Sequence, residues 1–284
     1  MTGSVRCGKC KSRFFAAHRL PGDVVRKGGN VMRREIPASD KNRFLQRISG
    51  ILYPGRCVLC DRILEKSAQM VCRDCRPLVR FIEEPRCCRC GRPLESDTEA
   101  YCENCKIHPR LFERGFAPFV YDGAVKEAIM RLKYGHRAEN ARFFAKSMYV
   151  CGKPFLTETA PQALVPVPIH RERRMRRGYN QAELLAEALS DLTGIPVVKN
   201  RILRVRGTAP QKELGMQQRK KNLAGAFRIT GETGRDRMIP ARVLIVDDIF
   251  TTGSTIDTLA ALLLRAGAEK VYFSCAAIAA GFSV

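Results

Sequence analysis

Apolar and polar positions divide the second half of the chain into alternating strand-like and helix-like segments. Apolar runs typical of buried strands lie at 163–169, 196–198, 242–247 and 270–279. Apolar residues at helical spacing predict helices over 124–134, 138–149 and 180–194, and a further helical pattern from 254 stops at Gly267. Strands that alternate with helices indicate an α/β fold with a parallel sheet.

The segment VLIVDDIFTTGST (243–255) combines a buried strand with candidate chemistry. Asp247 and Asp248 follow its apolar residues, at the carboxyl end where open α/β sheets place their ligands. The hydroxyl-rich turn TTGST then leads into the N-terminus of a predicted helix, which favours anions. An acidic pair beside such a turn predicts binding of a phosphorylated polyol.

A second polar segment, HRERRMRRGYNQ (170–181), carries five arginines and lies between a predicted strand and the next helix. We expect a loop on the same rim of the sheet as 248–255. Arginine forks match phosphate oxygens in two-point contacts, so the two loops together suit a sugar with phosphate at one end and pyrophosphate at the other. The competing interpretation is a solvated basic face or a nucleic-acid patch.

Cysteines are concentrated in the first half, where eleven of the thirteen precede residue 106. Residues 57–75 and 87–105 each read C-x2-C-x11-C-x2-C, thirty residues apart. Two CxxC turns supply the four thiolates of a tetrahedral, closed zinc site, so this spacing predicts structural zinc ribbons. The predicted ligands are Cys57, Cys60, Cys72, Cys75, Cys87, Cys90, Cys102 and Cys105.

The ligand pairing stays open at this point, because each repeat can bind its own zinc or CxxC turns from different repeats can pair. Cys88 is interpreted as a bystander thiol beside Cys87, with an alternative zinc ligand as the other interpretation. Residues 21–43 are rich in glycine, proline and charge, and we expect 1–50 to be a poorly ordered extension. Within it, Cys7 and Cys10 form half of a cysteine site, and Met32 is an alternative start.

The formal net charge of +22 indicates anionic partners such as nucleic acid or polyphosphate. Two four-thiolate zinc sites would lower it by about two units each and leave the protein strongly basic. No stretch approaches eighteen uninterrupted apolar residues, so no membrane span is expected. The N-terminal residues show no secretion signal, and we expect a cytoplasmic protein.

VLIVDDIFTTGST resembles the phosphoribosyl pyrophosphate (PRPP) signature of type I phosphoribosyltransferases: four apolar residues, two acids and a T-T-G-x-T turn. The double ribbon, RLKYGHRAENARFFA (131–145), HRERRMRRGYNQAELLA and APQKELGMQQRKKNLAGAF (209–227) are similar to the ComF/GntX branch of that fold. The resemblance covers roughly residues 50–280 and departs at the first fifty. It implies a zinc-ribbon module at 51–110 and a phosphoribosyltransferase-like domain at 111–284.

The resemblance also implies roles for residues. Asp247 and Asp248 are the implied catalytic residues and would accept hydrogen bonds from the ribose 2- and 3-hydroxyls. Arg177 and Gly178 would contact the pyrophosphate, which Mg²⁺ would neutralise. The residues implied to hold the 5-phosphate are Thr251, Thr252, Gly253, Ser254 and Thr255. A mobile loop at 204–227 would close with Gln211, Arg219 and Asn222, and residues 112–122 with 195–230 would form the acceptor hood. Lys133, Tyr134 and His136 are interpreted as ordinary helix-end residues, and the alternative is a basic group near the sheet rim.

The predicted function is a PRPP-binding phosphoribosyltransferase-family protein with zinc ribbons, linked by resemblance to DNA uptake in natural competence. The alternatives are a non-catalytic factor that handles single-stranded DNA, and a PRPP-responsive regulator. Competence and DNA-uptake proteins are its implied partners. The sequence names neither an acceptor nor an oligomeric state.

Overall fold

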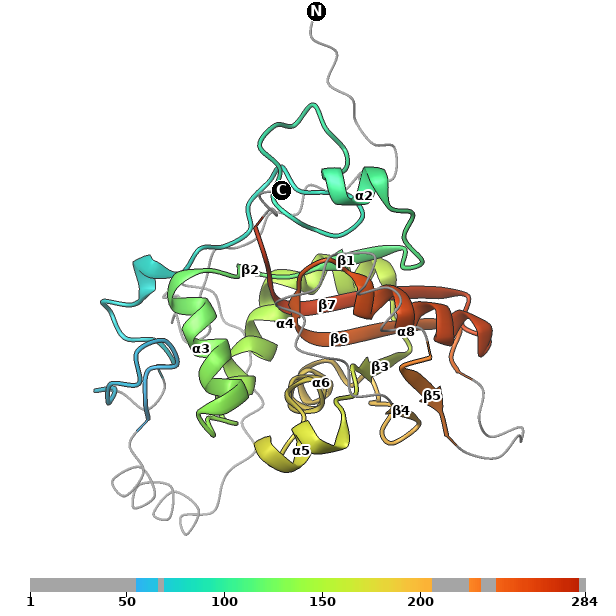
Figure 1. Ribbon diagram of the computed structural model, residues 1–284. Helices are drawn as coiled ribbons and strands as arrows, with labels where there is room; N and C mark the ends of the chain where they lie inside the picture. Colours follow the sequence, from blue (N-terminus) through green and yellow to red (C-terminus); the bar gives the residue numbers. More distant parts are fainter. Residues whose placement is uncertain (1–54, 66–68, 206–224, 231–238, 281–284) are drawn as a thin grey trace, which may run out of the picture.

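The computed structural model describes residues 55–65, 69–205, 225–230 and 239–280 (Figure 1). In the first half these residues form η1 (Arg76–Leu78), α2 (Glu103–Ile107), β1 (Arg114–Phe116), β2 (Phe119–Val120), α3 (Gly123–Tyr134) and α4 (Asn140–Thr159). The second half contains β3 (Ala163–Pro166), α5 (Arg171–Arg177), α6 (Gln181–Thr193), β4 (Ile202–Arg204), β5 (Phe227–Ile229), β6 (Arg242–Phe250), α8 (Ser254–Arg265) and β7 (Lys270–Ile278).

The central sheet is parallel and has the strand order β1-β7-β6-β3, with β2 also paired to β7. β6 pairs with β7 over most of its length and with β3 from Val243 to Val246. The predicted α/β class with a parallel sheet is therefore confirmed. Residues 112–122 were expected in an acceptor hood, and that prediction is wrong because they supply β1 and β2, which pair with β7 in the sheet.

Helices cover both faces of the sheet, as the continuous apolar runs of its strands require. Along β6, Leu244 and Val246 point into one hydrophobic cluster and Val243 and Ile245 into the other. The first cluster contains residues of α3, α4 and α6, and the second contains residues of α8. The antiparallel pair β4-β5 contributes to the second cluster as well.

The cysteine-rich repeats pack directly on this core. Leu59 and Val71 of the first repeat belong to the cluster with α3, and Ile82 between the repeats belongs to the cluster with α8. The segment between the repeats also pairs with β2, through backbone bonds from Ile82 N to Pro118 O (2.9 Å) and from Val120 N to Arg80 O (2.9 Å). The zinc-ribbon module therefore shares its hydrophobic core with the sheet.

Several predicted elements differ from the structure in extent or type: the strand predicted at 242–247 runs to Phe250, and the one predicted at 163–169 ends at Pro166. The helix predicted over 138–149 is α4, which continues through Pro154 to Thr159. The predicted loop at 170–181 contains α5, which ends at Gly178 in a left-handed conformation (φ 79°). The predicted strand 196–198 is reduced to one parallel bridge between Val197 and Leu164.

Several predictions fall outside the described residues: the extension 1–50 with Cys7, Cys10 and Met32, and the loop residues Gln211, Arg219 and Asn222. Within the described part of the chain, no helix has the length and apolar character needed to cross a membrane.

Candidate functional site

The eight predicted zinc ligands form two separate four-cysteine groups, one in each repeat. In each group the four sulfurs lie within 4.8 Å of one another. The Sγ atoms of Cys60 and Cys72 are 3.7 Å apart, and those of Cys90 and Cys102 are 3.6 Å apart. Tetrahedral zinc with four thiolates places its sulfurs about 3.8 Å apart, so both groups fit the ion. Each repeat therefore closes its own site, and Cys88 lies outside both groups.

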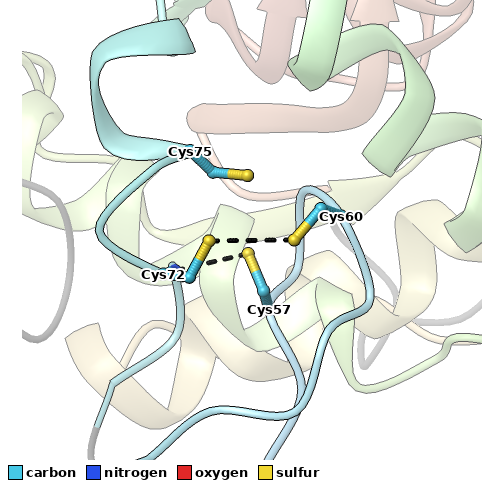
Figure 2. Close-up of side chains that lie close together, drawn as sticks. All are labelled: Cys57, Cys60, Cys72 and Cys75. Atoms are coloured by element: carbon cyan, nitrogen blue, oxygen red, sulfur yellow. Dashed lines mark hydrogen bonds between the residues drawn. The ribbon is translucent and has the colours of Figure 1, made fainter.

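The backbone of each first CxxC turn holds its cysteines in the same way. Cys57 N donates to Arg62 O at 2.8 Å, and Cys87 N donates to Arg92 O at 2.7 Å. Both turns need a left-handed residue, which is Asp61 in the first repeat (φ 64°) and Gly91 in the second (φ 77°). In the first site Cys72 N also donates to Cys57 Sγ at 3.3 Å, and Figure 2 shows the four side chains turned toward a common centre.

A separate cavity of about 450 Å³ lies where β3 ends and β6 continues beyond it. Its wall combines α3, α5, the start of α6, β4, the end of β6 and the turn before α8. The polar side chains that line it are Tyr121, Lys133, Tyr134, Arg173, Arg177, Asn180, Gln181, Arg204, Asp247, Asp248, Thr251 and Thr255. Two acids, two threonine hydroxyls and three arginines thus face one space.

The acidic pair lies inside β6, because the strand runs three residues past Asp247. Successive side chains of a strand point to opposite faces, so the two acids have different surroundings. Asp248 forms an ion pair with Lys133 of α3 (Oδ2 to Nζ, 2.9 Å). Asp247 lies beside Cys275 in the β6-β7 register, and burial together with the charge of Asp248 raises the pKa of Asp247 to about 7.

The turn between β6 and α8 divides the five residues that the resemblance assigned to a phosphate. Thr251 and Thr255 line the cavity. Thr252 and Ser254 are buried, and their hydroxyls lie 3.0 Å apart from each other. Gly253 adopts φ 85°, and a β-carbon there would lie 2.9 Å from Arg110 and 3.0 Å from Phe250, so the position requires glycine.

Arg177 lies on the cavity wall but is already engaged there. Its guanidinium stacks on the ring of Tyr134 (4.7 Å to the centroid) and donates to the Tyr134 hydroxyl at 2.9 Å and to Gln181 Oε1 at 2.8 Å. The amide nitrogen of Gln181 is buried and has no hydrogen-bond partner among the described residues. Gly178 does not line the cavity and ends α5.

Lys133, Tyr134 and Arg204 line the cavity although sequence reasoning gave them no site role. For Lys133 the structure fits the alternative of a basic group near the sheet rim, because α3 places it on the cavity wall together with Tyr134. The signal was present: Lys133 lies eight residues after Val125 and four after Ile129, so it continues the buried stripe of α3. His136, in contrast, lies outside the cavity wall.

Arg204 brings a cation from β4 to the cavity. Burial and the neighbouring charge of Arg173 lower the pKa of Arg204, while Asp247 partly compensates them. An anion bound between these two arginines would relieve their repulsion. The sequence gave no signal that Arg204 lines the cavity, because a strand of three residues such as β4 is too short to show a pattern.

Comparison with known proteins adds two findings. A double zinc ribbon domain matches residues 48–106. Competence protein F of Haemophilus influenzae is 35% identical over 146 residues, which are 50% of this chain and 63% of that protein. DNA utilization protein YhgH of Salmonella typhi is 33% identical over 228 residues, 79% of this chain and 97% of that protein.

A more distant relative has a related name. Competence protein ComFC of Bacillus subtilis is 27% identical over 223 residues, which are 78% of this chain and 75% of that protein. With its double zinc ribbon and its match to nearly the whole length of one relative, the chain belongs to the ComF/GntX family.

Proposed function

We propose that the cavity binds PRPP together with Mg²⁺. The single observation that carries this proposal is the meeting of Asp247, Asp248, Thr251, Thr255 and Arg177 around one cavity of about 450 Å³. Charged groups on a cavity wall need charged or hydrogen-bonding partners, which an apolar ligand would not provide. A ligand with hydroxyls in its middle can donate to the aspartates, and phosphates at its two ends can accept from the threonines and from the arginine.

Each part of PRPP has a matching group on the wall. The 5-phosphate lies at the N-terminus of α8, beside Thr251 and Thr255, where the helix dipole favours an anion. The ribose hydroxyls donate to Asp247 and Asp248, which need to be ionised to accept both bonds. The pyrophosphate, neutralised in part by Mg²⁺, lies toward Arg173, Arg177 and Arg204 and accepts from the Gln181 amide.

Transfer of the phosphoribosyl group is the reaction that this arrangement supports. A nucleophilic atom of the acceptor would bond to the anomeric carbon as the bond to pyrophosphate breaks, and pyrophosphate would leave with that electron pair. Positive charge develops on the ribose in between, and carboxylates in a low-dielectric site stabilise it.

We propose the same division of the chain as the sequence indicates: an extension at 1–50, the ribbons at 51–110 and the phosphoribosyltransferase-like domain at 111–284. Zinc in the ribbons is structural, since all four ligands of each site come from the protein.

Calorimetry with Mg²⁺ and PRPP tests the binding step. We expect saturable binding to the wild type and its loss when Asp247→Asn is combined with Asp248→Asn. Asp191→Asn, an exposed change on α6 outside the cavity wall, is the matched control and should leave the affinity unchanged. Wild-type protein that binds no Mg-PRPP, or a double variant that binds it normally, would refute the proposal.

Pyrophosphate release separates an enzyme from a sensor. With a suitable nucleobase or nucleic-acid acceptor, the wild type should release pyrophosphate from PRPP and the double variant should not. Binding of Mg-PRPP without any release across such acceptors would favour the PRPP-responsive regulator instead.

We also propose that the protein acts in DNA uptake, in line with the competence and DNA utilization names of its relatives. One observation favours direct contact with single-stranded DNA: α5 exposes Arg171, Arg174, Met175 and Arg176 next to the cavity. Such contact should depend steeply on salt, because bound phosphates release counterions.

A further inference from the structure

We propose that the second zinc ribbon holds the β6-α8 turn in its binding geometry through Arg92, a positioning residue that links the zinc site to the cavity. This inference rests on the proposed binding of PRPP at that turn. It adds a role for the ribbon, which otherwise only stabilises the fold.

Arg92 joins the ribbon to the ends of two sheet strands. Its two terminal nitrogens donate to Thr251 O and to Ala279 O, each at 2.7 Å. Thr251 follows β6 and lines the cavity, and Ala279 follows β7. The residue is only 5% exposed, so water competes little for these carbonyls. Arg92 thereby fixes the backbone at the first residue of the turn.

The zinc site determines where Arg92 lies. Arg92 O accepts from Cys87 N at 2.7 Å, and Gly91 N donates to Cys87 O at 2.8 Å, so Arg92 completes the tight turn of two zinc ligands. Gly91 lies against the sheet, where a β-carbon would come within 2.8 Å of Gly115 O. A displaced Cys87-Cys90 turn would therefore move the Arg92 backbone away from the two carbonyls that its side chain bonds.

A second contact from the same ribbon reaches the first turn of α8. Arg110 Nη1 lies 2.7 Å from Asp257 Oδ2, and Arg110 Nη2 donates to Asn104 O in α2 at 3.3 Å. Asn104 lies between the zinc ligands Cys102 and Cys105. The guanidinium also lies against Gly253, where it occupies the space of a β-carbon. Arg92 and Arg110 thus hold the turn from both of its ends.

The first repeat provides a natural comparison. Arg62 has the same place in its CxxC turn, and its carbonyl accepts from Cys57 N at 2.8 Å. Its side chain, however, is 66% exposed and pairs with Asp74 at 3.2 Å on the surface. The repeats therefore share the backbone role of this arginine, whereas only the second directs its side chain to the cavity turn.

The test compares Arg92→Met with Arg62→Met in the full-length, zinc-loaded protein. Amide hydrogen exchange of 251–257 is measured without ligand, and Mg-PRPP affinity is measured by calorimetry. Losing two buried hydrogen bonds from a charged donor should speed exchange in 251–257 and weaken Mg-PRPP affinity, each by about tenfold or more. Arg62→Met should change both by less than about twofold, as an exposed ion pair predicts. Both variants should retain the zinc content of the wild type.

Exchange and affinity report on different properties of the turn. Unchanged exchange at 251–257 in Arg92→Met would overturn the inference, and so would faster exchange with normal Mg-PRPP affinity. If the wild type binds no Mg-PRPP, the proposed function fails, while exchange alone still decides whether Arg92 holds the turn. If Arg92→Met does not fold, Arg92→Lys replaces it, because a single ammonium group lacks the guanidinium fork that reaches both carbonyls: faster exchange in 251–257 supports the inference, and unchanged exchange overturns it.

Discussion

Asp247 and Asp248 are neighbours in sequence, yet the fold treats their charges differently. Asp248 Oδ2 forms an ion pair with Lys133 Nζ at 2.9 Å. Burial and the adjacent charge of Asp248 raise the pKa of Asp247 from its usual 3.8 to about 7. The folded protein therefore binds the Asp247 proton more tightly than the unfolded chain does. The stability from this proton is fully present below pH 4 and is lost as the pH rises through about 7.

Asp247→Asn should consequently stabilise the protein at high pH. Because the asparagine cannot ionise and still offers an oxygen to Asp248 N, we expect a gain of about 1 to 3 kcal/mol at pH 8 and little change at pH 4.5. Urea unfolding of the zinc-loaded protein at both pH values measures it. Asp191→Asn should leave the free energy of unfolding unchanged at both pH values. A loss of stability at pH 8 in Asp247→Asn would contradict a raised pKa of Asp247.

This gain in stability would come with a loss of ligand binding. Ionising Asp247 costs stability in the empty protein, but the ionised carboxylate accepts hydrogen bonds from the hydroxyls of a bound polyol. Residues at this cavity accordingly serve the proposed ligand at some cost to the fold.

The two ribbons are repeated elements that have become different at matching positions. The left-handed residue of the first is Asp61, whose carboxylate bonds Arg137 Nη2 at 2.6 Å just after α3, whereas the second uses Gly91 against β1. Arg131 of α3 also donates to Leu59 O of the first ribbon. The first ribbon thus contacts the helix that carries Lys133, and the second contacts the turn before α8. Each ribbon supports a different wall of the cavity.

Cysteine substitutions test the ligand assignment of these elements. Cys90→Ser should remove one zinc per chain, because three thiolates and a weakly bound hydroxyl make a much poorer site. Cys88→Ser should leave both zinc ions in place, since Cys88 lies outside both four-cysteine groups. Metal analysis of the purified proteins measures this. Loss of zinc from Cys88→Ser, or full zinc in Cys90→Ser, would show that the ligand set is different.

Elements with strong periodicity were predictable, and those shaped by distant contacts were not. The apolar run of β6 identified the start of that strand, and Gly194 identified the end of α6. α4 continues through Gly152 and Pro154 to Thr159, and the missing β-carbon at Gly152 leaves room for the ring of Phe116, which would lie 2.8 Å from it. β6 extends past its two acids because β7 remains paired with it up to Phe250. Such pairings come from residues far away in sequence.

In the candidate site, too, residues within local motifs were predictable, whereas residues brought in by the fold were not. Asp247, Asp248, Thr251, Thr255 and Arg177 were predicted from local motifs, and all of them line the cavity. Lys133 and Tyr134 lie in a segment that resembles the family but was given no ligand role, and Arg204 reaches the cavity from a three-residue strand. Thr252 and Ser254 match the motif but are buried and interact with each other. Motif spacing identifies the segment, whereas packing decides which side chains face the ligand.

At the scale of the whole molecule, the zinc sites, the sheet and the cavity form one connected body. Cys57 and Cys75 belong to the hydrophobic cluster that contains α3 and α4, and Cys87 and Cys90 belong to the cluster that contains α8. Loss of zinc therefore disturbs both faces of the sheet rather than a tethered appendage. We expect the ribbons and the α/β part to unfold in one cooperative transition.

The net charge of +22 is the other property of the whole chain, and α5 presents part of it beside the cavity. Arg171 and Arg176 are exposed and do not line the cavity, whereas Arg173 and Arg177 do. If single-stranded DNA runs along α5, the exposed pair contacts its phosphates. Replacing both with glutamine should then weaken binding of an oligothymidylate and lower the slope of log affinity against log salt by about 1.4, or 0.7 per lost phosphate contact.

The same double variant should bind Mg-PRPP as tightly as the wild type, which keeps the DNA surface and the cavity distinguishable. Fluorescence anisotropy across a salt series measures the slope, and calorimetry measures the ligand affinity. Lys126→Gln with Lys153→Gln, two exposed lysines on α3 and α4, removes the same charge elsewhere and is the matched control. If both double variants lower the slope equally, DNA responds to the overall charge and α5 has no special role.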